Sequence, residues 1–526
     1  MPEPELRHPS QQRKIHPVFR YIARRLVSAL LVVFAASFLI YVLAANAGDP
    51  LEDLRSSTAP NKQELIDAKV SALNLDVPAP LRYFIWLSGL GKIFIGQLDL
   101  GESIKGVQVT ELLAQSIWST LTLVTVATIL SILFGIAIGM ATALRQYSGF
   151  DYSVTFVAFL FFSLPIFWVA QLLKLYLAIG FNDFLLDPVI PPVVIILTAL
   201  VVGFVWASVV GGDAKKYFTN FGIAIVVTAA GLVYIEASDW IVSPSLGVVW
   251  IGVLGLVAAF GVTYLTTGLA NRRALYASLV IAALGAALWY PVQFLFFYAP
   301  GPLGIALLVV LFVALGLLAG WLFGGADRAV SVRAALITSV VVIVLLLVDR
   351  LMGSWPDYVA ATGGRPIATI GSVTPNLGGS IWIQGLDVFT HLLLPTIALM
   401  LLSLAGWSRY SRASLLEVMN QDYVRTARAK GLTERTVVMR HAFRNALIPI
   451  TTLVAFEIGA VIGGAAITES VFGWSGMGSL FVHSISTVDL NPVMGVFVIT
   501  SIVALLFNLI ADLVYSALDP RIRVNS

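Results

Sequence analysis

The chain has 526 residues, of which 58% are hydrophobic and only 12% are charged, and its formal net charge is +3. Soluble domains are about one quarter charged, so this composition excludes an ordinary water-soluble protein and indicates an integral membrane protein. The chain has no cysteine, which excludes disulfides, thiolate metal sites and cysteine nucleophiles.

Apolar runs long enough to cross a bilayer as helices occur about twelve times along the chain. They are predicted at about 26–45, 118–144, 152–180, 190–211, 218–236, 246–268, 274–298, 302–324, 331–349, 391–408, 447–468 and 492–515. The basic segment 1–25 runs directly into the first of them without a small-residue cleavage site, so this run is interpreted as a retained span and not as a signal peptide. The predicted fold class is an all-α integral membrane protein.

Positive charge alternates between the loops that connect these spans. If segment 1–25 is cytoplasmic, the loops and tail expected on the same side are basic and contain Arg145, Lys215, Lys216, Arg272, Arg273, Arg328, Arg333, Arg521 and Arg523. The short loops expected outside, FNDFLLDP, EASDWIVSPS and YAPGP, contain no Lys or Arg. By the positive-inside rule, both termini are therefore predicted to be cytoplasmic.

Two of the segments expected outside are longer than the others. Segment 48–115 mixes charges of both signs. Segment 356–390 is rich in Gly, Pro, Ser and Thr and is predicted to be loop with little regular structure. Neither segment is large enough to form a separate catalytic domain.

The predicted cytoplasmic loop 409–446 contains most of the basic stretch YVRTARAKGLTERTVVMRHAFRNALIP. Asn420 or Asp422 is predicted to cap a short helix over 423–430. Gly431 is well placed to end that helix in a left-handed turn, because glycine adopts this conformation without a steric penalty.

A second helix is predicted after this turn. Thr433 caps it, Glu434 lies in its first turn where the helix dipole favours an anion, and the helix runs through basic residues toward Pro449. One explanation is that these charges only set the membrane orientation and contact anionic lipid. A compact, capped turn is more than charge alone requires, so the favoured prediction is docking to a cytoplasmic protein partner.

The sequence DYVRTARAKGL, followed after a basic helix by NALIP, resembles the EAA loop of ABC-importer permeases of the dipeptide and oligopeptide permease family. In that family the short helix inserts into a cleft of a cytoplasmic ATPase subunit. The resemblance implies ATPase-coupling residues at Tyr423, Arg425, Thr426, Ala427, Arg428, Ala429, Lys430, Gly431, Leu432 and Glu434. Arg425, Thr426 and Ala427 stand where the general importer loop has Glu-Ala-Ala, as is common in the peptide branch.

Further matches to this family extend the resemblance to roughly 1–185 and 380–526. LNLDVPAPLRYFIWL and LDLGESI resemble its external segment after the first span, and FFSLPIFWVAQLL resembles its third span. TESVFGWSGMGSLF resembles its external loop after the coupling region, and ADLVYSALDPRIR resembles its C-terminus. Ser475 departs from the pattern, because the family usually has proline there.

Permeases of this family usually have six spans, so the resemblance implies a permease core in two parts, 26–187 and 391–526, interrupted by about six extra spans in 188–355. It also implies a bacterial inner-membrane location, a second similar permease subunit, two cytoplasmic ATPase subunits that hold ATP and magnesium, and an external substrate-binding protein. The chain itself is then expected to translocate di- or oligopeptides without a cofactor of its own.

The inserted block 188–355 is apolar and has short loops and little charge within its spans. Because intramembrane charge commonly marks a substrate pathway, we expect a lipid-facing addition packed against the core. A docking surface for another membrane protein is the open alternative. Gly316 and Gly320 form a GxxxG pattern that supports close helix packing, and Gly135 and Gly139 form another in the second span.

Two places are candidates for a gate or an external mouth. Pro165 lies within the third span, where it either kinks the helix for packing or marks a gate-associated break. The second place is the outer end of a later span, which carries Glu469, Phe472, Trp474, Gly476 and Gly478. These residues can line the mouth, contact a delivery protein, or only fix an external turn.

Motifs for nucleotide or metal chemistry are missing from the sequence. There is no G-x-x-x-x-G-K-[ST] loop and no H-E-x-x-H, and the five histidines have no metal-ligand spacing. The chain is therefore predicted to be non-catalytic. The alternative function is a twelve-span secondary active transporter, which should show two related halves and intramembrane ionisable residues, of which the sequence has few.

Overall fold

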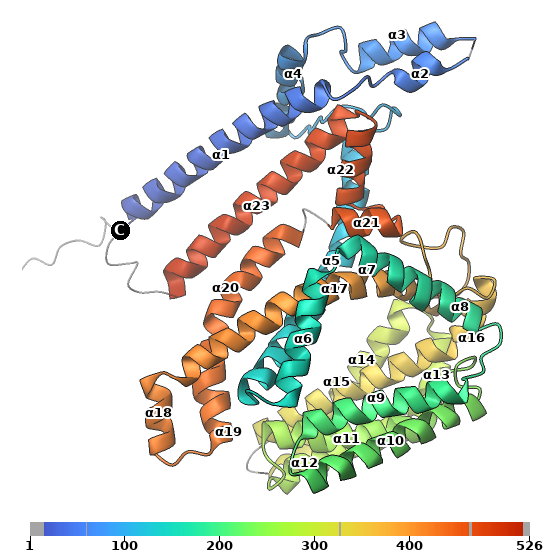
Figure 1. The fold of residues 1–526 in the computed structure, drawn as a ribbon, viewed down its shortest axis with the longest axis vertical. Helices are drawn as coiled ribbons and strands as arrows, with labels where there is room; N and C mark the ends of the chain where they lie inside the picture. The colour runs from blue at the N-terminus through green and yellow to red at the C-terminus, as the bar shows by residue number, and fades with distance from the viewer. Residues whose placement is uncertain (1–14, 59, 326–327, 462–464, 519–526) are drawn as a thin grey trace, which may run out of the picture. The chain divides into compact units, whose positions relative to one another are not determined.

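The computed structural model describes residues 15–58, 60–325, 328–461 and 465–518. These residues form helices and loops without a β-strand, so the predicted all-α class is confirmed over them (Figure 1). Nine of the described helices are long and apolar enough to cross a membrane. Two bent helix pairs pass the same test, so the described residues contain up to eleven spans if each bent pair forms one span. The predicted span 447–468 overlaps α20 (Phe443–Val461), and its residues 462–464 lie outside the described residues, as do residues 1–14 of the predicted cytoplasmic segment 1–25 and residues 519–526.

The chain folds into two compact units. Unit 1 comprises Met1–Leu172, Ile370–Ser372 and Pro395–Ser526, and unit 2 comprises Leu173–Thr369 and Val373–Leu394. The long helix α17 (Ile381–Met419) contributes residues to both units.

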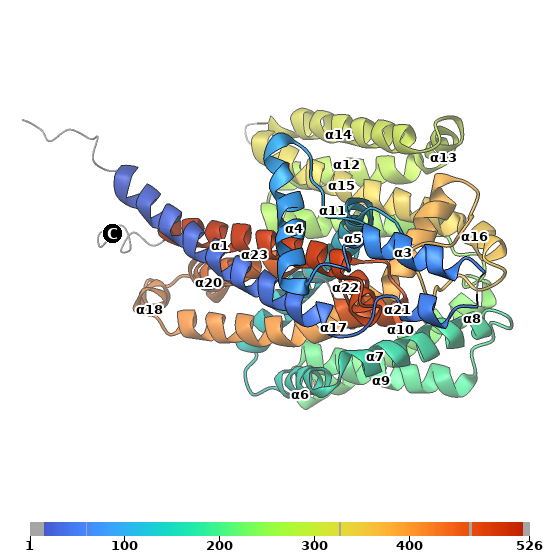
Figure 2. The ribbon, with the colours of Figure 1, turned by 90° about the horizontal axis from the view of Figure 1, so that it is seen from above.

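Unit 1 is built from helices at the two ends of the chain. They are α1 (Ile15–Ala45), α2 (Glu52–Ser56), α3 (Lys62–Ala72), α4 (Ala79–Gly91), η2 (Lys92–Ile95), α5 (Val109–Leu144), α6 (Gly149–Ser163), α7 (Ile166–Leu172), α18 (Asp422–Ala429), α19 (Glu434–Thr436), η5 (Val437–Ala442), α20, α21 (Ala466–Phe472), α22 (Met477–Ser486) and α23 (Leu490–Leu518). Helix α1 lies beside α4 and α23 (Figures 1 and 2), and α5 packs against α20, α22 and α23.

Two glycines bring α5 and α17 into close contact. A Cβ atom added at Gly135 would lie 2.4 Å from Cβ of Trp407, and one at Gly139 would lie 2.4 Å from the carbonyl oxygen of Ser408. Neither position has room for a side chain, which confirms the predicted packing seam in this helix. Close backbone approach of this kind is how helices associate in lipid, where apolar surface alone gives no preference for one partner.

The third predicted span is broken at Pro165. Helix α6 ends at Ser163, α7 begins at Ile166, and the two helical segments are bent by 105°. Proline cannot donate the backbone hydrogen bond that would continue the helix, and it disfavours helical geometry at Leu164 before it. The predicted disruption at Pro165 is therefore confirmed, and its role as a gate stays a prediction.

Unit 2 contains the central helices of the chain. They are η3 (Leu173–Ile179), α8 (Gly180–Phe184), α9 (Pro192–Val210), α10 (Ala214–Ala237), α11 (Gly247–Thr266), α12 (Arg272–Ala287), α13 (Trp289–Tyr298), α14 (Pro302–Gly324), α15 (Arg328–Gly353) and α16 (Trp355–Ala361). Helices α9 and α10 pair with each other, and α11, α12, α14 and α15 pack into a group around a common apolar core (Figure 1).

The GxxxG pattern of α14 packs directly onto α15. A Cβ atom added at Gly316 would lie 2.5 Å from Oγ of Ser339, and one at Gly320 would lie 2.4 Å from Cα of Val332. The predicted close packing at these glycines is confirmed. It makes α14 and α15 the most extensively contacting helix pair of the described structure.

A buried carboxylate joins three helices of unit 2. Asp349, near the end of α15, accepts hydrogen bonds from the backbone N–H groups of Leu246 and Gly247, both at 2.9 Å, and from the Trp289 indole at 2.6 Å. The two N–H groups lie at the start of α11, where no intrahelical acceptor is available. Asp349 is therefore explained by helix packing.

The segment predicted as an external loop, 356–390, is shorter than expected at both ends. Helix α16 extends to Ala361, and α17 begins at Ile381, ten residues before the predicted span. The expectation of little regular structure was therefore wrong for these ends. The reason for this error is that most of the Gly, Pro and Ser residues lie in 362–380. The residues on either side of this range bury apolar and polar side chains that support helices.

The contact at Gly320 predicts a stability difference between two glycine substitutions. Gly320→Ala should lower the free energy of unfolding by about 1–3 kcal/mol, because its methyl group collides with backbone atoms of α15. Gly231→Ala, in α10 with no atom within 4 Å of the added methyl, should be neutral or slightly stabilising. Thermal unfolding of the two variants in detergent tests this difference, and equal melting temperatures would contradict it.

Candidate functional site

The basic stretch forms a short helix followed by a tight turn. Helix α18 spans Asp422–Ala429, and its Val424 and Ala427 are buried against Val437 of η5. Val418 and Met419, at the end of α17, pack on the same cluster. These small apolar contacts hold α18 against the ends of two longer helices and leave its other faces in contact with solvent.

The coupling residues inferred from the resemblance lie almost entirely on the exposed faces of this element. One of them, Ala427, is buried. The exposed members are Tyr423, Arg425, Thr426, Arg428, Ala429, Lys430, Gly431, Leu432 and Glu434. The structure thus leaves nine of the ten predicted residues exposed on α18 and the turn after it, and their role in coupling stays a prediction.

Gly431 is placed as predicted, directly after the helix and in the left-handed region, with φ of +76°. Any other residue would be strained there. Across this turn the Arg428 guanidinium binds the Glu434 carboxylate through two bonds, of 2.7 and 3.1 Å. The Arg428 guanidinium holds the pKa of Glu434 below its usual value. Because both side chains are well exposed, this pair shapes the turn more than it stabilises the protein.

Two details of the predicted stretch differ in the structure. The side chains of Asn420 and Asp422 do not cap α18: Gln421 holds the cap position without a side-chain bond, and the Asn420 amide donates to the carbonyl of Leu416 in the preceding helix. Thr433 does cap the second helix as predicted, accepting from the N–H of Thr436 at 3.4 Å. This helix does not end before the span, because α19, η5 and α20 follow one another without a break.

The second candidate site surrounds a fully buried carboxylate, Glu469 of α21. One of its oxygens accepts the Thr120 hydroxyl of α5 at 2.8 Å, and the other accepts the backbone N–H of Ser479 at 2.9 Å. The Thr120 oxygen in turn accepts the N–H of Met477 at 2.7 Å. Hydrogen bonds of this kind offset the cost of burying an ionisable group, and they pin the turn between α21 and α22 onto α5.

The other residues predicted at this place complete the same turn. Trp474 and Phe472 are buried, and the Trp474 indole donates to the Ser119 carbonyl at 3.1 Å. Gly476 and Gly478 have no room for a side chain. A Cβ atom added at Gly476 would lie 2.4 Å from the Glu469 carboxyl carbon, and one added at Gly478 would lie 2.5 Å from Cα of Ala466. These contacts explain the residues as a packed turn, so a direct role in lining a mouth stays a prediction.

Gly476 supplies a test of this packed turn. Gly476→Ala should lower the free energy of unfolding by about 1–3 kcal/mol, because the new methyl group overlaps the buried Glu469 carboxyl group. Gly406→Ala, on an exposed position of α17 with no atom within 4 Å, is the matched control and should unfold like the wild type. Thermal unfolding in detergent measures both, and an unchanged Gly476→Ala protein would rule out the tight packing around Glu469.

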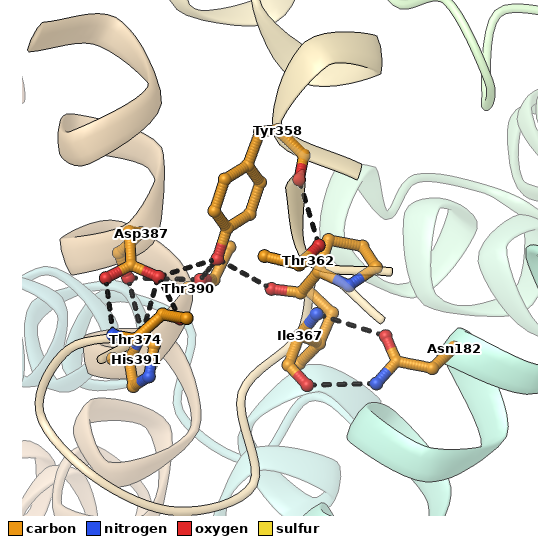
Figure 3. Close-up of polar contacts among 9 residues, drawn as sticks. Asn182, Tyr358, Thr362, Ile367, Thr374, Asp387, Thr390 and His391 are labelled. Carbon is orange, nitrogen blue, oxygen red and sulfur yellow. Dashed lines mark hydrogen bonds and ion pairs between the residues drawn. The ribbon is translucent and has the colours of Figure 1, made fainter. Parts of the chain in front are cut away.

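Unit 2 contains a buried polar network that sequence reasoning missed (Figure 3). Asp387 of α17 accepts the Tyr358 hydroxyl at 3.2 Å, the Thr374 hydroxyl at 2.5 Å and the Thr374 N–H at 2.8 Å. Tyr358 also shares a 2.7 Å hydrogen bond with Thr390. His391 lies one turn further along, with Nδ1 2.8 Å from the Asp387 carbonyl. Asp387 and His391, four residues apart in an apolar helix, were the signal that could have located this network.

The network holds the segment 362–380 in place. The Tyr358 hydroxyl oxygen lies 3.1 Å from the Pro366 carbonyl oxygen, an alternative acceptor to Asp387, and the Asn182 amide bonds both the N–H and the carbonyl of Ile367, at 3.0 and 2.9 Å (Figure 3). Buried backbone groups without regular secondary structure need such partners. The cluster is therefore explained by its role in holding this loop in place, which is a structural role.

The geometry defines a multi-pass α-helical membrane protein with an exposed basic helix at one place and buried, hydrogen-bonded polar clusters around Glu469, Asp349 and Asp387. Among the described residues, no group of three or more His, Cys, Asp or Glu side chains is arranged to hold a metal ion.

Comparison with known proteins shows a similarity over the C-terminal part of the chain. Residues 313–524 match the family of binding-protein-dependent transport system inner membrane components. The chain is similar to this family over these residues, and its apolar helices are those of a multi-pass protein of the inner membrane. Proteins of this family are transport permeases, the non-catalytic membrane components of these systems.

The similar relatives are peptide permeases. An oligopeptide transport system permease protein of Mycobacterium tuberculosis is 41% identical over 202 residues, covering 38% of this chain and 61% of that protein. An oligopeptide transport system permease protein of Bacillus subtilis is 44% identical over 136 residues, covering 26% and 43%. A dipeptide transport system permease protein of Escherichia coli is 40% identical over 138 residues, covering 26% and 41%. The chain thus spans about three fifths of the first relative and about two fifths of the others.

Proposed function

We propose that the chain is a non-catalytic permease subunit of an ATP-driven importer for di- or oligopeptides. The observation that carries the proposal is the exposed basic helix α18, held against the end of α17 and against η5 by a small apolar core. In this proposal the partners are a second, similar permease, two cytoplasmic ATPase subunits that bind ATP and magnesium, and an extracytoplasmic binding protein. The names of the related peptide permeases support the substrate class.

The contacts behind α18 supply a route by which a movement of this helix reaches the spans. Next to the α18 cluster, Ala143 of α5, Leu415 of α17 and Ala446 of α20 share a second apolar cluster. The Ser414 hydroxyl donates to the Ala446 carbonyl at 2.8 Å across the same junction. Because packed helices move as rigid bodies, a partner that displaces α18 would displace the inner ends of α17, α20 and α5 together.

The surface of α18 predicts an uncoupling mutation. Arg428→Glu places two acidic groups on either side of the Gly431 turn and reverses the charge of the proposed contact surface. Peptide uptake per ATP hydrolysed by the intact complex should fall about tenfold or more, equivalent to about 1.4 kcal/mol of lost coupling. Gly431→Pro, which distorts the same turn, should behave alike while both proteins still insert into the membrane.

The control for this test is Lys215→Glu, which reverses an exposed charge in another predicted cytoplasmic loop and should leave uptake unchanged. Uptake measured in membrane vesicles, with the ATPase rate of the same vesicles, separates lost coupling from lost assembly. Full uptake by both Arg428→Glu and Gly431→Pro would exclude α18 as the coupling element.

The region 188–355 is proposed to be an addition to a six-span core formed by 26–187 and 391–526, with 356–390 as an external connection. An even number of inserted spans is needed, because an odd number would place the coupling loop 409–446 on the wrong side of the membrane. The helices α9 to α15 provide six such spans if the bent pair of α12 and α13 counts as one.

Cysteine labelling tests this topology directly, since the chain has no cysteine of its own. A membrane-impermeant maleimide should label Ser243→Cys and Ser475→Cys from outside in intact cells, and it should label Lys215→Cys and Lys430→Cys only after permeabilisation. All four positions are exposed, so failure to label would not reflect burial. Labelling of Lys215 and Lys430 from opposite sides would overturn the proposed even insertion.

A further inference from the structure

A polar pocket of about 490 Å³ lies in unit 1, at the end predicted to be extracytoplasmic. It is formed by the end of α1, the C-terminal end of α3, helix α4 and the segment that precedes α5. The residues that matter for its chemistry are Tyr41, Arg82, Trp86, Lys92, Asp99 and Glu102. None of them belongs to the coupling surface or to the turn around Glu469.

Two hydrogen-bond donors in this pocket are buried and lack an acceptor. Arg82 is 8% exposed and Trp86 is 7% exposed. Within the described part of the chain, neither Nε of Arg82 nor the indole Nε1 of Trp86 has a hydrogen-bond partner. Buried polar groups are normally satisfied, and an arginine cannot lose its charge to avoid the cost of burial.

The carboxylates that line the pocket, Asp99 and Glu102, bond to Lys92 and Gln108 and not to Arg82. Lys92 binds Asp99 at 2.8 Å, which satisfies that carboxylate, and Glu102 accepts the Gln108 amide at 2.9 Å. No ion pair involving Arg82 occurs among the described residues, and its guanidinium contacts the neutral Tyr41 side chain, 6.0 Å from the ring centroid. The pocket therefore holds a buried cation that forms no ion pair with the described residues.

The walls of the pocket are fixed by close packing. Helix α4 is held on α1 by Tyr83, which packs edge-on against Phe38 and Tyr41. Gly89 of α4 touches the segment before α5, since a Cβ atom there would lie 2.6 Å from the Asp99 carbonyl oxygen. On the opposite side, the Asn491 amide donates to the Glu102 carbonyl at 2.7 Å. A rigid frame of this kind preorganises the two donors for a ligand.

We propose that this pocket binds the carboxylate group of a small ligand, with the Arg82 guanidinium and the Trp86 indole N–H as donors. A guanidinium matches a carboxylate through parallel N–H bonds, and the charge of the ligand supplies the missing counter-ion. The carboxylate can belong to a simple organic acid or to the C-terminus of a short peptide. The inference does not rest on the proposed transport function, because it concerns binding by the chain alone.

Titration calorimetry on the purified full-length chain in detergent tests the proposal with a matched pair of probes. Glycylglycine should bind and glycylglycinamide should not, because the two differ only in the terminal carboxylate. Acetate distinguishes a simple organic acid from a peptide as the ligand. If acetate binds as tightly as glycylglycine, the site accepts any small carboxylate; if acetate binds more weakly, the site also contacts the rest of the peptide. Both results support the proposal. Equal binding of glycylglycine and its amide, or no binding of either carboxylate, would overturn it.

Two substitutions assign the donors. Arg82→Gln should weaken carboxylate binding about tenfold to hundredfold, the loss typical of a charge-assisted hydrogen bond. Trp86→Phe removes the N–H but keeps an aromatic ring, so it should weaken binding by a smaller factor and keep the fold. Arg55→Gln, at an exposed arginine of the same predicted external segment, is the control and should bind like the wild type. Wild-type affinity in both Arg82→Gln and Trp86→Phe would exclude these donors.

Discussion

Every polar group that this chain buries among its apolar helices needs a partner within the protein, because lipid supplies none. Three buried carboxylates show how the requirement is met. Glu469 ties the turn between α21 and α22 to α5, Asp349 holds the start of α11, and Asp387 anchors the segment before α17. In each case the acceptor oxygens satisfy backbone N–H groups at a helix start or in a loop, where regular structure leaves them unpaired.

The same constraint separates the structural clusters from the candidate functional sites. The carboxylates Glu469, Asp349 and Asp387 are surrounded by donors from the chain itself. Helix α18 differs because its charged residues face outward, and Arg82 differs because its buried guanidinium has no carboxylate partner among the described residues. A buried donor that has no acceptor within the chain is a candidate position for an external partner.

Glycine sets the distances at which the helices meet. The GxxxG patterns of α5 and α14 place backbone against backbone, with Gly139 next to Ser408 and Gly320 next to Val332. Gly431 has the opposite role, since its surroundings are open and only its positive φ requires glycine. Sequence reasoning located all of these positions, because a missing side chain is visible in the sequence whether space or conformation demands it.

The sequence by itself determined the all-α class, the places of the apolar helices, the break at Pro165 and the turn at Gly431, because hydrophobic length, proline and glycine act locally. It also located Glu469 and its glycines but left their role open. Only the tertiary structure decided that Glu469 meets Thr120, that Asp387 joins Tyr358 and Thr374, and that Arg82 shares a pocket with Trp86. These pairings depend on which helices pack against each other. In lipid, that packing is decided by close contact and hydrogen bonding between segments far apart in the chain.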